Sequence, residues 1–378
     1  MTVKILIGDV RDRLRSMSAD SVDCVVTSPP YWGLRDYGVD GQIGLEPTLG
    51  EHLSVMVGVF EEVRRVLKPT GTLWLNYGDC YATSPNGRSA ADTKAAGTDD
   101  RTFRDKPFST IQGVLKAKDL CMVPNRLAIA LQEAGWWVRS EIIWAKPNPM
   151  PESINDRPAT SHEKIFLLSR APRYHYDADA VRQGRTSDED ANTFRGGAYT
   201  GGDTDNTTTG KRKVRGNQRV PAGWDTSIGS GGHGSIHKTG RRDSFKRDDS
   251  KRAAVHPGQS MGTHRPDRED VAYPRGEGRN LRNYEPAPVQ VWPIATRPFS
   301  EAHFATFPPE LAERCLQAGC PAGGTVLDPF GGAGTTALVA DRMGLDCTII
   351  ELNPEYAEIA RNRIASEQGM FVNVSVVT

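Results

Sequence analysis

Apolar residues recur along the chain in two alternating patterns. Short, nearly continuous apolar runs are typical of buried strands, and stretches with an apolar residue every three or four positions are typical of helices. The first pattern predicts strands at residues 3–9, 22–28, 71–79, 137–147, 162–170, 324–330, 346–352 and 370–377. The second predicts a short helix from Val10 and further helices at 51–67, 123–136, 307–319, 331–344 (entered through a glycine loop) and 353–368.

Strands that alternate with helices indicate an α/β fold, with a mostly parallel sheet covered by helices on both faces. The carboxyl ends of parallel strands meet at one edge of such a sheet, and ligands bind at that edge. Residues that directly follow a predicted strand are therefore the first candidates for a functional site.

Two segments lack the alternating pattern. Residues 80–118 are polar and predict a long loop. Residues 182–282 carry 20 Lys and Arg against 13 Asp and Glu, although the whole chain has 47 of each, and they are poor in aliphatic side chains. This composition is typical of a nucleic-acid-binding surface. A solvated, partly disordered insertion is the alternative interpretation.

Composition excludes several classes of protein. No apolar run approaches the roughly 18 residues of a membrane span, and the N-terminus lacks the features of a signal peptide. The six cysteines are scattered and form no C-x-x-C pair, which argues against a zinc site and a disulfide framework. We expect a cytoplasmic protein with reduced thiols, no membrane association and no metal site.

The stretch DPFGGAGTT, residues 328–336, lies between a predicted strand and a predicted helix. Gly332, Gly334 and Ala337 fit the pattern G-x-G-x-x-[GA], whose glycines let a ligand approach backbone N–H groups at a helix N-terminus. Glu351 ends the next strand, where an acidic side chain suits the hydroxyls of a ribose. The loop predicts a nucleoside-containing ligand, and a tight turn without a ligand is the alternative.

The chain order argues against NAD as this ligand. Only 55 residues run from Gly324 to the end, too few for a complete dinucleotide-binding fold. The strand that ends at Asp9 should therefore complete the sheet beside the C-terminal strands. Asp328 and Phe330 place a carboxylate and an aromatic ring where a pyrophosphate would be disfavoured. S-adenosylmethionine fits better, because its amino group can meet Asp328 and its sulfonium tolerates an aromatic face.

The stretch TSPPYW, residues 27–32, ends another predicted strand at the same edge. Proline has a fixed φ, so Pro29 and Pro30 pre-set the directions of their carbonyl acceptors. Ser28 adds a hydroxyl and Tyr31 adds a flat ring. Such a corner suits the exocyclic amino group of a nucleobase, because acceptors in the ring plane would favour a pyramidal nitrogen with a free lone pair. The base would have to be flipped out of the duplex, and Tyr31 would stack on it.

Together these stretches resemble the amino-group DNA methyltransferases, the N4-cytosine and N6-adenine enzymes of restriction–modification systems and phages. TSPPYW resembles their catalytic motif, DPFGGAGTT their methyl-donor loop, and IGD the strand end that faces the donor's adenine. The motif order is that of the family's beta group. The resemblance implies a permuted Rossmann-like fold dependent on S-adenosylmethionine. It also implies a catalytic half at 1–180, a basic target-recognition region at 181–292 and a donor-binding half at 293–378.

The resemblance further implies the roles of single residues. Ser28, the Pro29 carbonyl, Pro30 and Tyr31 would form the catalytic pocket. The donor-binding residues would be Asp9, Asp328, Pro329, Phe330, Gly331, Gly332, Gly334, Thr335 and Glu351.

The residue before the two prolines bears on which base is methylated. Ser28 stands where the family's adenine enzymes usually carry Asp or Asn, and this favours N4 of cytosine. Methylation at C5 is disfavoured because it needs a thiolate nucleophile, and Tyr31 rather than Cys follows the prolines. We expect a site-specific methyltransferase for cytosine N4 in double-stranded DNA, with a cognate restriction endonuclease as a possible partner. N6-adenine methylation, methylation of RNA or a protein amide, and a non-catalytic DNA-binding module are the alternatives.

Overall fold

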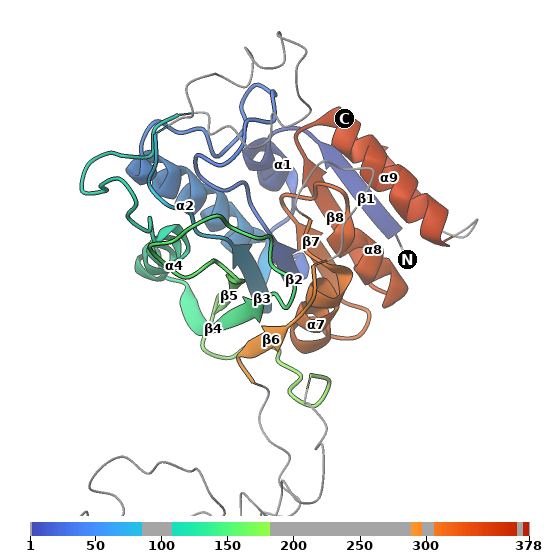
Figure 1. Ribbon diagram of the computed structural model, residues 1–378. Helices are drawn as coiled ribbons and strands as arrows, with labels where there is room; N and C mark the ends of the chain where they lie inside the picture. The colour runs from blue at the N-terminus through green and yellow to red at the C-terminus, as the bar shows by residue number, and fades with distance from the viewer. Residues whose placement is uncertain (1, 85–107, 182–288, 297–305, 369–372, 378) are drawn as a thin grey trace, which may run out of the picture. The chain divides into compact units, whose positions relative to one another are not determined.

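The computed structural model describes residues 2–84, 108–181, 289–296, 306–368 and 373–377 (Figure 1). Its strands are β1 (Thr2–Ile7), β2 (Val22–Thr27), β3 (Leu67–Tyr77), β4 (Trp137–Ala145), β5 (His162–Ser169), β6 (Val291–Pro293), β7 (Thr325–Asp328), β8 (Asp346–Glu351) and β9 (Asn373–Val377). Its helices are α1 (Val10–Ser16), α2 (Leu49–Val66), α4 (Val123–Glu133), α7 (Pro309–Gly319), α8 (Thr335–Arg342) and α9 (Pro354–Gln368).

The described strands form one nine-stranded sheet in the order β6-β4-β5-β3-β2-β7-β8-β1-β9. All neighbouring pairs are parallel except those that involve β5, which runs antiparallel to β3 and β4. β1 lies between β8 and β9 and pairs in parallel with both. The predicted α/β class with a mostly parallel sheet is confirmed, as is the expectation that the N-terminal strand joins the C-terminal ones.

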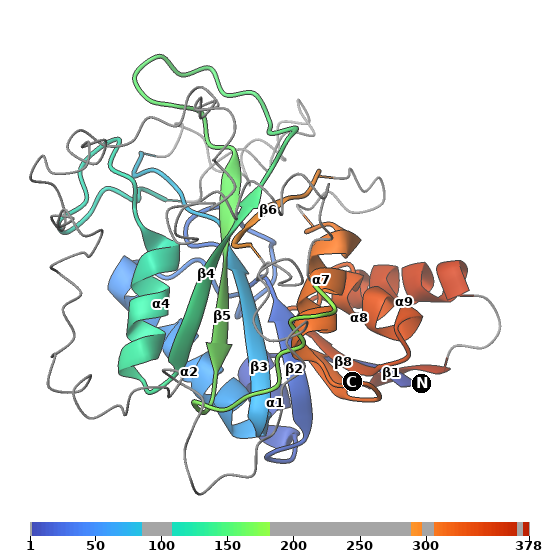
Figure 2. The ribbon, with the colours of Figure 1, turned by 90° about the horizontal axis from the view of Figure 1, so that it is seen from below.

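Strand residues alternate between two hydrophobic cores, one on each face of the sheet. On one face α1, α2 and α4 pack over side chains such as Val25, Leu73 and Leu75. On the other face α7, α8 and α9 pack over side chains such as Val26 and Trp74. Figures 1 and 2 show these two helical layers on either side of the strands.

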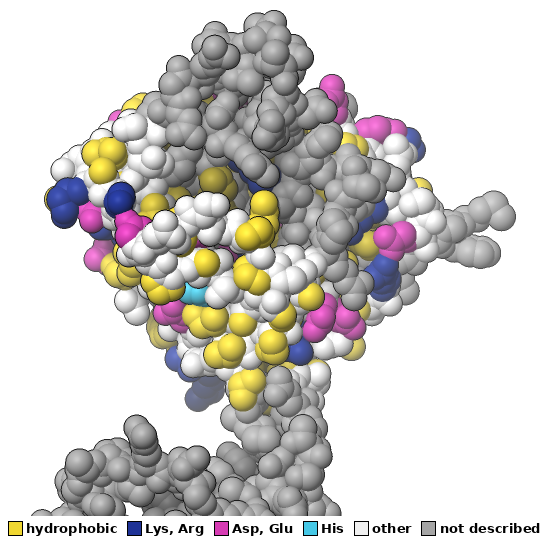
Figure 3. Space-filling model, viewed as in Figure 1, with side chains coloured by type: hydrophobic (Ala, Val, Ile, Leu, Met, Phe, Trp, Pro, Cys, Tyr) yellow, Lys and Arg dark blue, Asp and Glu magenta, His cyan; other side chains and the backbone are white. Residues whose placement is uncertain are grey.

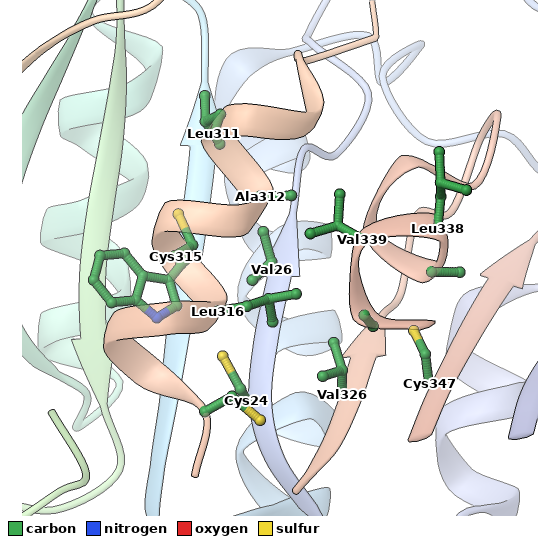
Figure 4. Close-up of a cluster of buried hydrophobic side chains, with 14 of the residues drawn as sticks. Cys24, Val26, Leu311, Ala312, Cys315, Leu316, Val326, Leu338, Val339 and Cys347 are labelled. Carbon is green, nitrogen blue, oxygen red and sulfur yellow. The ribbon is translucent and has the colours of Figure 1, made fainter. Parts of the chain in front are cut away.

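The second core joins the two ends of the chain. Figure 4 shows Cys24 and Val26 of β2 and Val326 of β7 in one cluster with Cys315 and Leu316 of α7. These cysteines are fully buried and serve as small apolar side chains. Burial raises the pKa of the Cys24 thiol well above its usual value.

Two strands of the structure, β3 and β6, differ from what the sequence predicts. β3 begins at Leu67, four residues before the predicted strand, because the chain passes from α2 into the sheet with no intervening loop. β6 was not predicted, and its first two residues, Val291 and Trp292, fall inside the segment 181–292 assigned to the basic region. Its three residues pair with Ile143, Trp144 and Ala145, and so short a run carries no periodicity to detect.

No helix in the described part of the chain has the length and hydropathy of a membrane span. Within those same residues there is also no cluster of three or more His, Cys, Asp and Glu side chains suited to a metal ion.

Candidate active site

The two motifs lie at one edge of the sheet, at the carboxyl ends of parallel strands. Ser28 directly follows β2, Asp328 ends β7, and Glu351 ends β8. Ile7 of β1 pairs with Glu351, which brings Asp9 to the same edge. β2 is the direct neighbour of β7, so the corner after β2 and the glycine loop after β7 are adjacent although 300 residues separate them in the sequence.

Asp328 is fixed in the interior at the start of the glycine loop. It is 1% exposed and accepts hydrogen bonds from the hydroxyls of Thr27 and Thr336, both at 2.7 Å. The backbone N–H of Phe330 donates a third bond at 3.0 Å. Burial raises the pKa of Asp328 to about 7. With three hydrogen bonds and 1% exposure, the carboxylate ties β2, β7 and α8 together in the interior.

Glu351 organises the glycine loop from the neighbouring strand. Its carboxylate accepts hydrogen bonds from the backbone N–H groups of Gly332 at 2.8 Å and Asn353 at 2.9 Å. Burial raises the pKa of Glu351. A carboxylate has about four acceptor positions, so two bonds leave room for the hydroxyls of a ribose.

The glycines of the loop have separate reasons to be glycine. Gly334 has φ +74°, and a Cβ there would lie 2.9 Å from the Cβ of Ala360 in α9. Gly331 packs against Ile349, where a Cβ would lie 2.8 Å from the Ile349 Cβ. Gly332 has φ +49°, and a Cβ there would meet no atom of the described residues within 4 Å. The loop is therefore packed against the protein on one side and open beside Gly332.

Asp9 follows β1 at the same edge of the sheet, and its carboxylate is already paired. It caps the N-terminus of α1 by accepting a hydrogen bond from the backbone N–H of Arg11 at 2.8 Å, and it also accepts the Arg11 Nε–H at 2.9 Å. The bond from the Arg11 guanidinium lowers the pKa of Asp9. The backbone N–H of Gly8 donates to the carbonyl of Glu351 at 2.9 Å and so links the two strand ends.

The Pro-Pro corner is held from one side by a chain of buried polar groups. The hydroxyl of Tyr77, at the end of β3, donates to the carbonyl of Pro30 at 3.2 Å and accepts the backbone N–H of Trp32 at 3.1 Å. The ring of His52, in α2, connects Tyr77 Oη at 2.8 Å to a carboxylate oxygen of Glu46 at 2.8 Å. Because these groups are rigidly packed, the direction of the Pro30 carbonyl is fixed before any substrate arrives.

Tyr31 is anchored at both its ring and its hydroxyl. Its ring stacks on Tyr77 with centroids 4.7 Å apart and an interplanar angle of 27°. Its hydroxyl donates to Glu163 Oε2 at 2.9 Å. Burial, with the nearby Glu163 carboxylate, raises the pKa of Tyr31 well above its usual value. Gly78 lies against the ring, and a Cβ at that position would come within 2.5 Å of Tyr31 Cε2.

The model for the N6/N4 methyltransferase family, described as DNA methylase, matches residues 22–362. The chain belongs to this family of DNA methylases. It is 36% identical over 361 residues to the type II methyltransferase M.SmaI of Serratia marcescens, covering 96% of this chain and 90% of that protein. It is also 36% identical over 368 residues to M.Cfr9I of Citrobacter freundii, covering 97% and 89%.

A solved structure has the same fold. The cytosine-N4-specific PvuII DNA methyltransferase matches with a TM-score of 0.53 and 15% sequence identity, covering 99% of this chain and 95% of that one. This likeness confirms the predicted methyltransferase fold class. In this chain TSPPYW precedes the glycine loop, as in the family's motif order inferred above.

Sequence reasoning missed several residues that surround the corner of this DNA methylase. Asn76 and Tyr77 close β3, Glu163 opens β5, and Lys146 follows β4. Polar residues at the ends of apolar strands were the available signal. For Glu163 this signal was insufficient, because β5 runs antiparallel and its first residues rather than its last reach this edge of the sheet.

The predicted basic region lies outside the described residues, which omit 182–288. On the face shown in Figure 3, Lys and Arg side chains are interspersed with Asp and Glu around the rim, and hydrophobic side chains gather toward the lower part. Of the predicted loop at 80–118, residues 85–107 are likewise not described.

Proposed function

We propose that this chain transfers a methyl group from S-adenosylmethionine to the exocyclic N4 amine of a flipped-out cytosine in duplex DNA. The observation that carries the proposal is the meeting of two sites at one sheet edge. Ser28 and the corner follow β2, and the glycine loop with Glu351 follows β7 and β8, so a nucleobase and a nucleoside donor would lie side by side.

The loop residues fit the donor. Glu351 offers acceptors for the ribose hydroxyls, and the open space beside Gly332 admits the ligand next to backbone N–H groups. Asp9 would face the adenine, and Phe330 is half-buried at the rim of the loop. Asp328 would act by fixing the turn, through Thr27 and Thr336, with Pro329, Gly331, Gly334 and Thr335 shaping the backbone. The bound donor supplies a methyl group on a positively charged sulfur.

The corner residues would prepare the amine. The exocyclic nitrogen of a base is a poor nucleophile because its lone pair is delocalised into the ring. Ser28 Oγ and the Pro29 carbonyl would accept its two N–H groups and favour a pyramidal nitrogen. Tyr31, anchored by Tyr77 and Glu163, would stack on the flipped base and return about 1–3 kcal/mol of the cost of flipping.

The preference for cytosine rests on Ser28, which is short and uncharged at the position where adenine enzymes usually carry a longer Asp or Asn. N6-adenine is the second candidate, because it needs the same donor site and the same pyramidal amine. We also propose that the segment 181–292 supplies the target-recognition contacts and that a cognate restriction endonuclease accompanies this chain.

Replacing Glu351 with glutamine is expected to weaken donor binding about tenfold, or about 1.4 kcal/mol. Both carboxylate oxygens accept backbone N–H groups, so an amide NH2 must face either Gly332 or Asn353. Isothermal calorimetry with S-adenosylmethionine gives the affinity directly. The matched control is Glu355→Gln on α9, which is exposed and should bind the donor as the wild type does. Equal affinity in Glu351→Gln and the wild type would remove Glu351 from the donor site.

Replacing Gly78 with alanine is expected to lower kcat about tenfold, because the added Cβ would displace the Tyr31 ring from its stack on Tyr77. Donor affinity should stay unchanged. Gly58→Ala in α2 is the control, since a Cβ there would meet no atom within 4 Å in the part of the chain that the structure describes, and alanine favours a helix. A wild-type kcat in Gly78→Ala would show that the position of the Tyr31 ring does not limit the reaction.

Comparison of substrates tests the proposed function. Labelled S-adenosylmethionine would be incubated with unmethylated duplex DNA, the separated strands of the same DNA, and RNA of the same sequence. We expect transfer to duplex DNA at the highest rate. Preferential labelling of RNA, or labelling of protein instead of nucleic acid, would contradict the proposal and support one of the alternatives.

A further inference from the structure

Five side chains form a continuous polar cluster behind the catalytic corner, which we call the Glu163 network. Glu163 Oε2 accepts from Tyr31 Oη at 2.9 Å and from Asn76 Nδ2 at 3.0 Å. Glu163 Oε1 accepts from Lys146 Nζ at 2.5 Å. Asn76 Nδ2 also lies 3.3 Å from Ser28 Oγ, and Ser28 Oγ lies 3.4 Å from Tyr31 Oη.

The network is built by the antiparallel entry of β5 into the sheet. Asn76 pairs with Ile165, so Glu163 is its diagonal neighbour on the same face of the sheet. Lys146 follows β4 directly, next to the start of β5. The side chains of Lys146 and Glu163 are 20% and 17% exposed, so this ion pair is largely removed from solvent.

The Glu163 carboxylate determines which of its neighbours donate a hydrogen and in which direction. A carboxylate only accepts and an ammonium only donates, so Lys146 keeps Glu163 as an acceptor. Tyr31 must then donate its hydroxyl hydrogen to Glu163, and Asn76 must turn its NH2 side toward the same oxygen. Asn76 Oδ1 has no hydrogen-bond partner among the described residues, so the amide is held from its Nδ2 side.

This order reaches the catalytic serine. The Tyr31 hydroxyl hydrogen is committed to Glu163, so Tyr31 Oη acts as an acceptor, toward Asn76 Nδ2 at 3.3 Å and toward the Ser28 hydroxyl at 3.4 Å. The Ser28 hydrogen is thereby drawn toward Tyr31, and a lone pair on Ser28 Oγ remains for another donor. A serine without this order could equally present its hydrogen, which would repel an N–H group.

We infer that Glu163 is a positioning residue that sets Ser28 as a hydrogen-bond acceptor toward the target amine, acting through Tyr31 and Asn76. The inference rests on the proposed function, because it concerns the amine that Ser28 would hold. It differs from a purely structural role for the Lys146–Glu163 pair, which would stabilise the sheet without affecting the polarity of Ser28.

The chain supplies a matched control for that difference. Lys164 and Glu141 form a second ion pair between β5 and β4, at 2.7 Å, and Lys164 also donates to Asn125 Oδ1. Among the described residues, neither Glu141 nor Asn125 has a hydrogen bond or ion pair to the corner. Glu141→Gln therefore weakens a cross-strand pair of the same chemistry with no route to Ser28.

The test compares Glu163→Gln with Glu141→Gln in single-turnover methylation at saturating donor. An amide can donate to Tyr31 Oη and reverse the hydrogen order. We expect the methyl-transfer rate of Glu163→Gln to fall about tenfold, with the KM for DNA and the donor affinity unchanged. Glu141→Gln should keep the wild-type rate. In a Ser28→Ala background, Glu163→Gln should change the rate less than threefold, because the group it orients is gone.

Three outcomes overturn the inference. The first is a wild-type rate in Glu163→Gln. The second is the same tenfold loss with and without Ser28, which would show that Glu163 does not act through that hydroxyl. The third applies if Glu163→Gln does not fold. A double-mutant cycle of Tyr31→Phe and Ser28→Ala then tests the coupling between Tyr31 and Ser28, and additive losses of rate in that cycle overturn the inference. Methylation by the wild type is measured first. A wild type that does not methylate overturns the proposed function itself. An active wild type together with any of the three outcomes overturns the role of Glu163 alone.

Discussion

Replacing Asp328 with asparagine is expected to change the free energy of unfolding, relative to the wild type, in a pH-dependent way. The difference between variant and wild type should be about 2–3 kcal/mol more favourable to the variant near pH 8 than near pH 5. Burial raises the pKa of Asp328 to about 7, from a usual value of 3.8. The folded protein therefore holds this proton more tightly than the unfolded chain does. The stability from this group is present in acid and is lost as the pH rises from about 4 through about 7, whereas asparagine does not titrate.

Asparagine also fits the hydrogen bonds at this site. Its oxygen can accept from Thr27 and from the backbone N–H of Phe330, as the carboxylate does. Its NH2 group can donate to Thr336, whose own hydroxyl then turns to the carbonyl of Val26 at 3.4 Å. No buried polar group is left without a partner, so the variant should fold and show the loss of titration alone.

Urea denaturation of both proteins near pH 5 and near pH 8 measures this effect. Asp156→Asn is the control of opposite sign, because Asp156 is exposed and its hydrogen bond with Lys118 lowers its pKa. That variant should gain nothing near pH 8. The contrary result is a difference in unfolding free energy between Asp328→Asn and the wild type that is the same at both pH values. It would show that Asp328 is ionised in the folded protein at both, because its three hydrogen-bond donors outweigh the effect of burial.

Replacing Ser28 with alanine is expected to lower the methyl-transfer rate by roughly 10–100-fold, which corresponds to the loss of about 1–3 kcal/mol from one hydrogen bond at the amine. Among the described side chains the half-buried hydroxyl has hydrogen bonds only with Asn76 and Tyr31, so its removal is expected to leave the sheet and the glycine loop intact. Donor affinity should therefore be that of the wild type.

Single-turnover rates at saturating donor, together with calorimetry, separate these two effects. Ser21→Ala, at the opposite end of β2, is the matched control. Its hydroxyl donates to the carbonyl of Ser18, far from the functional edge, and its loss should not alter the rate. A Ser28→Ala variant that lost donor binding but kept its rate at saturation would place Ser28 in the donor site instead.

The sequence was sufficient for the parts of the site that follow parallel strands. Ser28, Asp328 and Glu351 each end an apolar run, and the rule that carboxyl ends of parallel strands share an edge brought them together correctly. The position of β1 beside β8 followed from the shortness of the C-terminal segment.

The surroundings of the corner could not be predicted in the same way. Glu163 and Asn76 are 87 residues apart and meet only because β5 enters between β3 and β4 in the reverse direction. A strand's apolar pattern does not state its direction or its neighbours. Asp328 illustrates a related limit. The sequence predicted its place at this edge of the sheet, but it did not predict that the hydroxyls of Thr27 and Thr336 donate to its carboxylate.

The most direct test of the central claim is nucleoside mass spectrometry. The purified protein would be incubated with labelled S-adenosylmethionine and unmethylated bacterial DNA, and the DNA would then be digested to nucleosides. We predict label in N4-methylcytosine. Label in N6-methyladenine would keep the donor site and the amine chemistry but contradict the interpretation of Ser28. Label in neither nucleoside, with none in RNA, would contradict the proposal that this corner methylates a nucleobase amine.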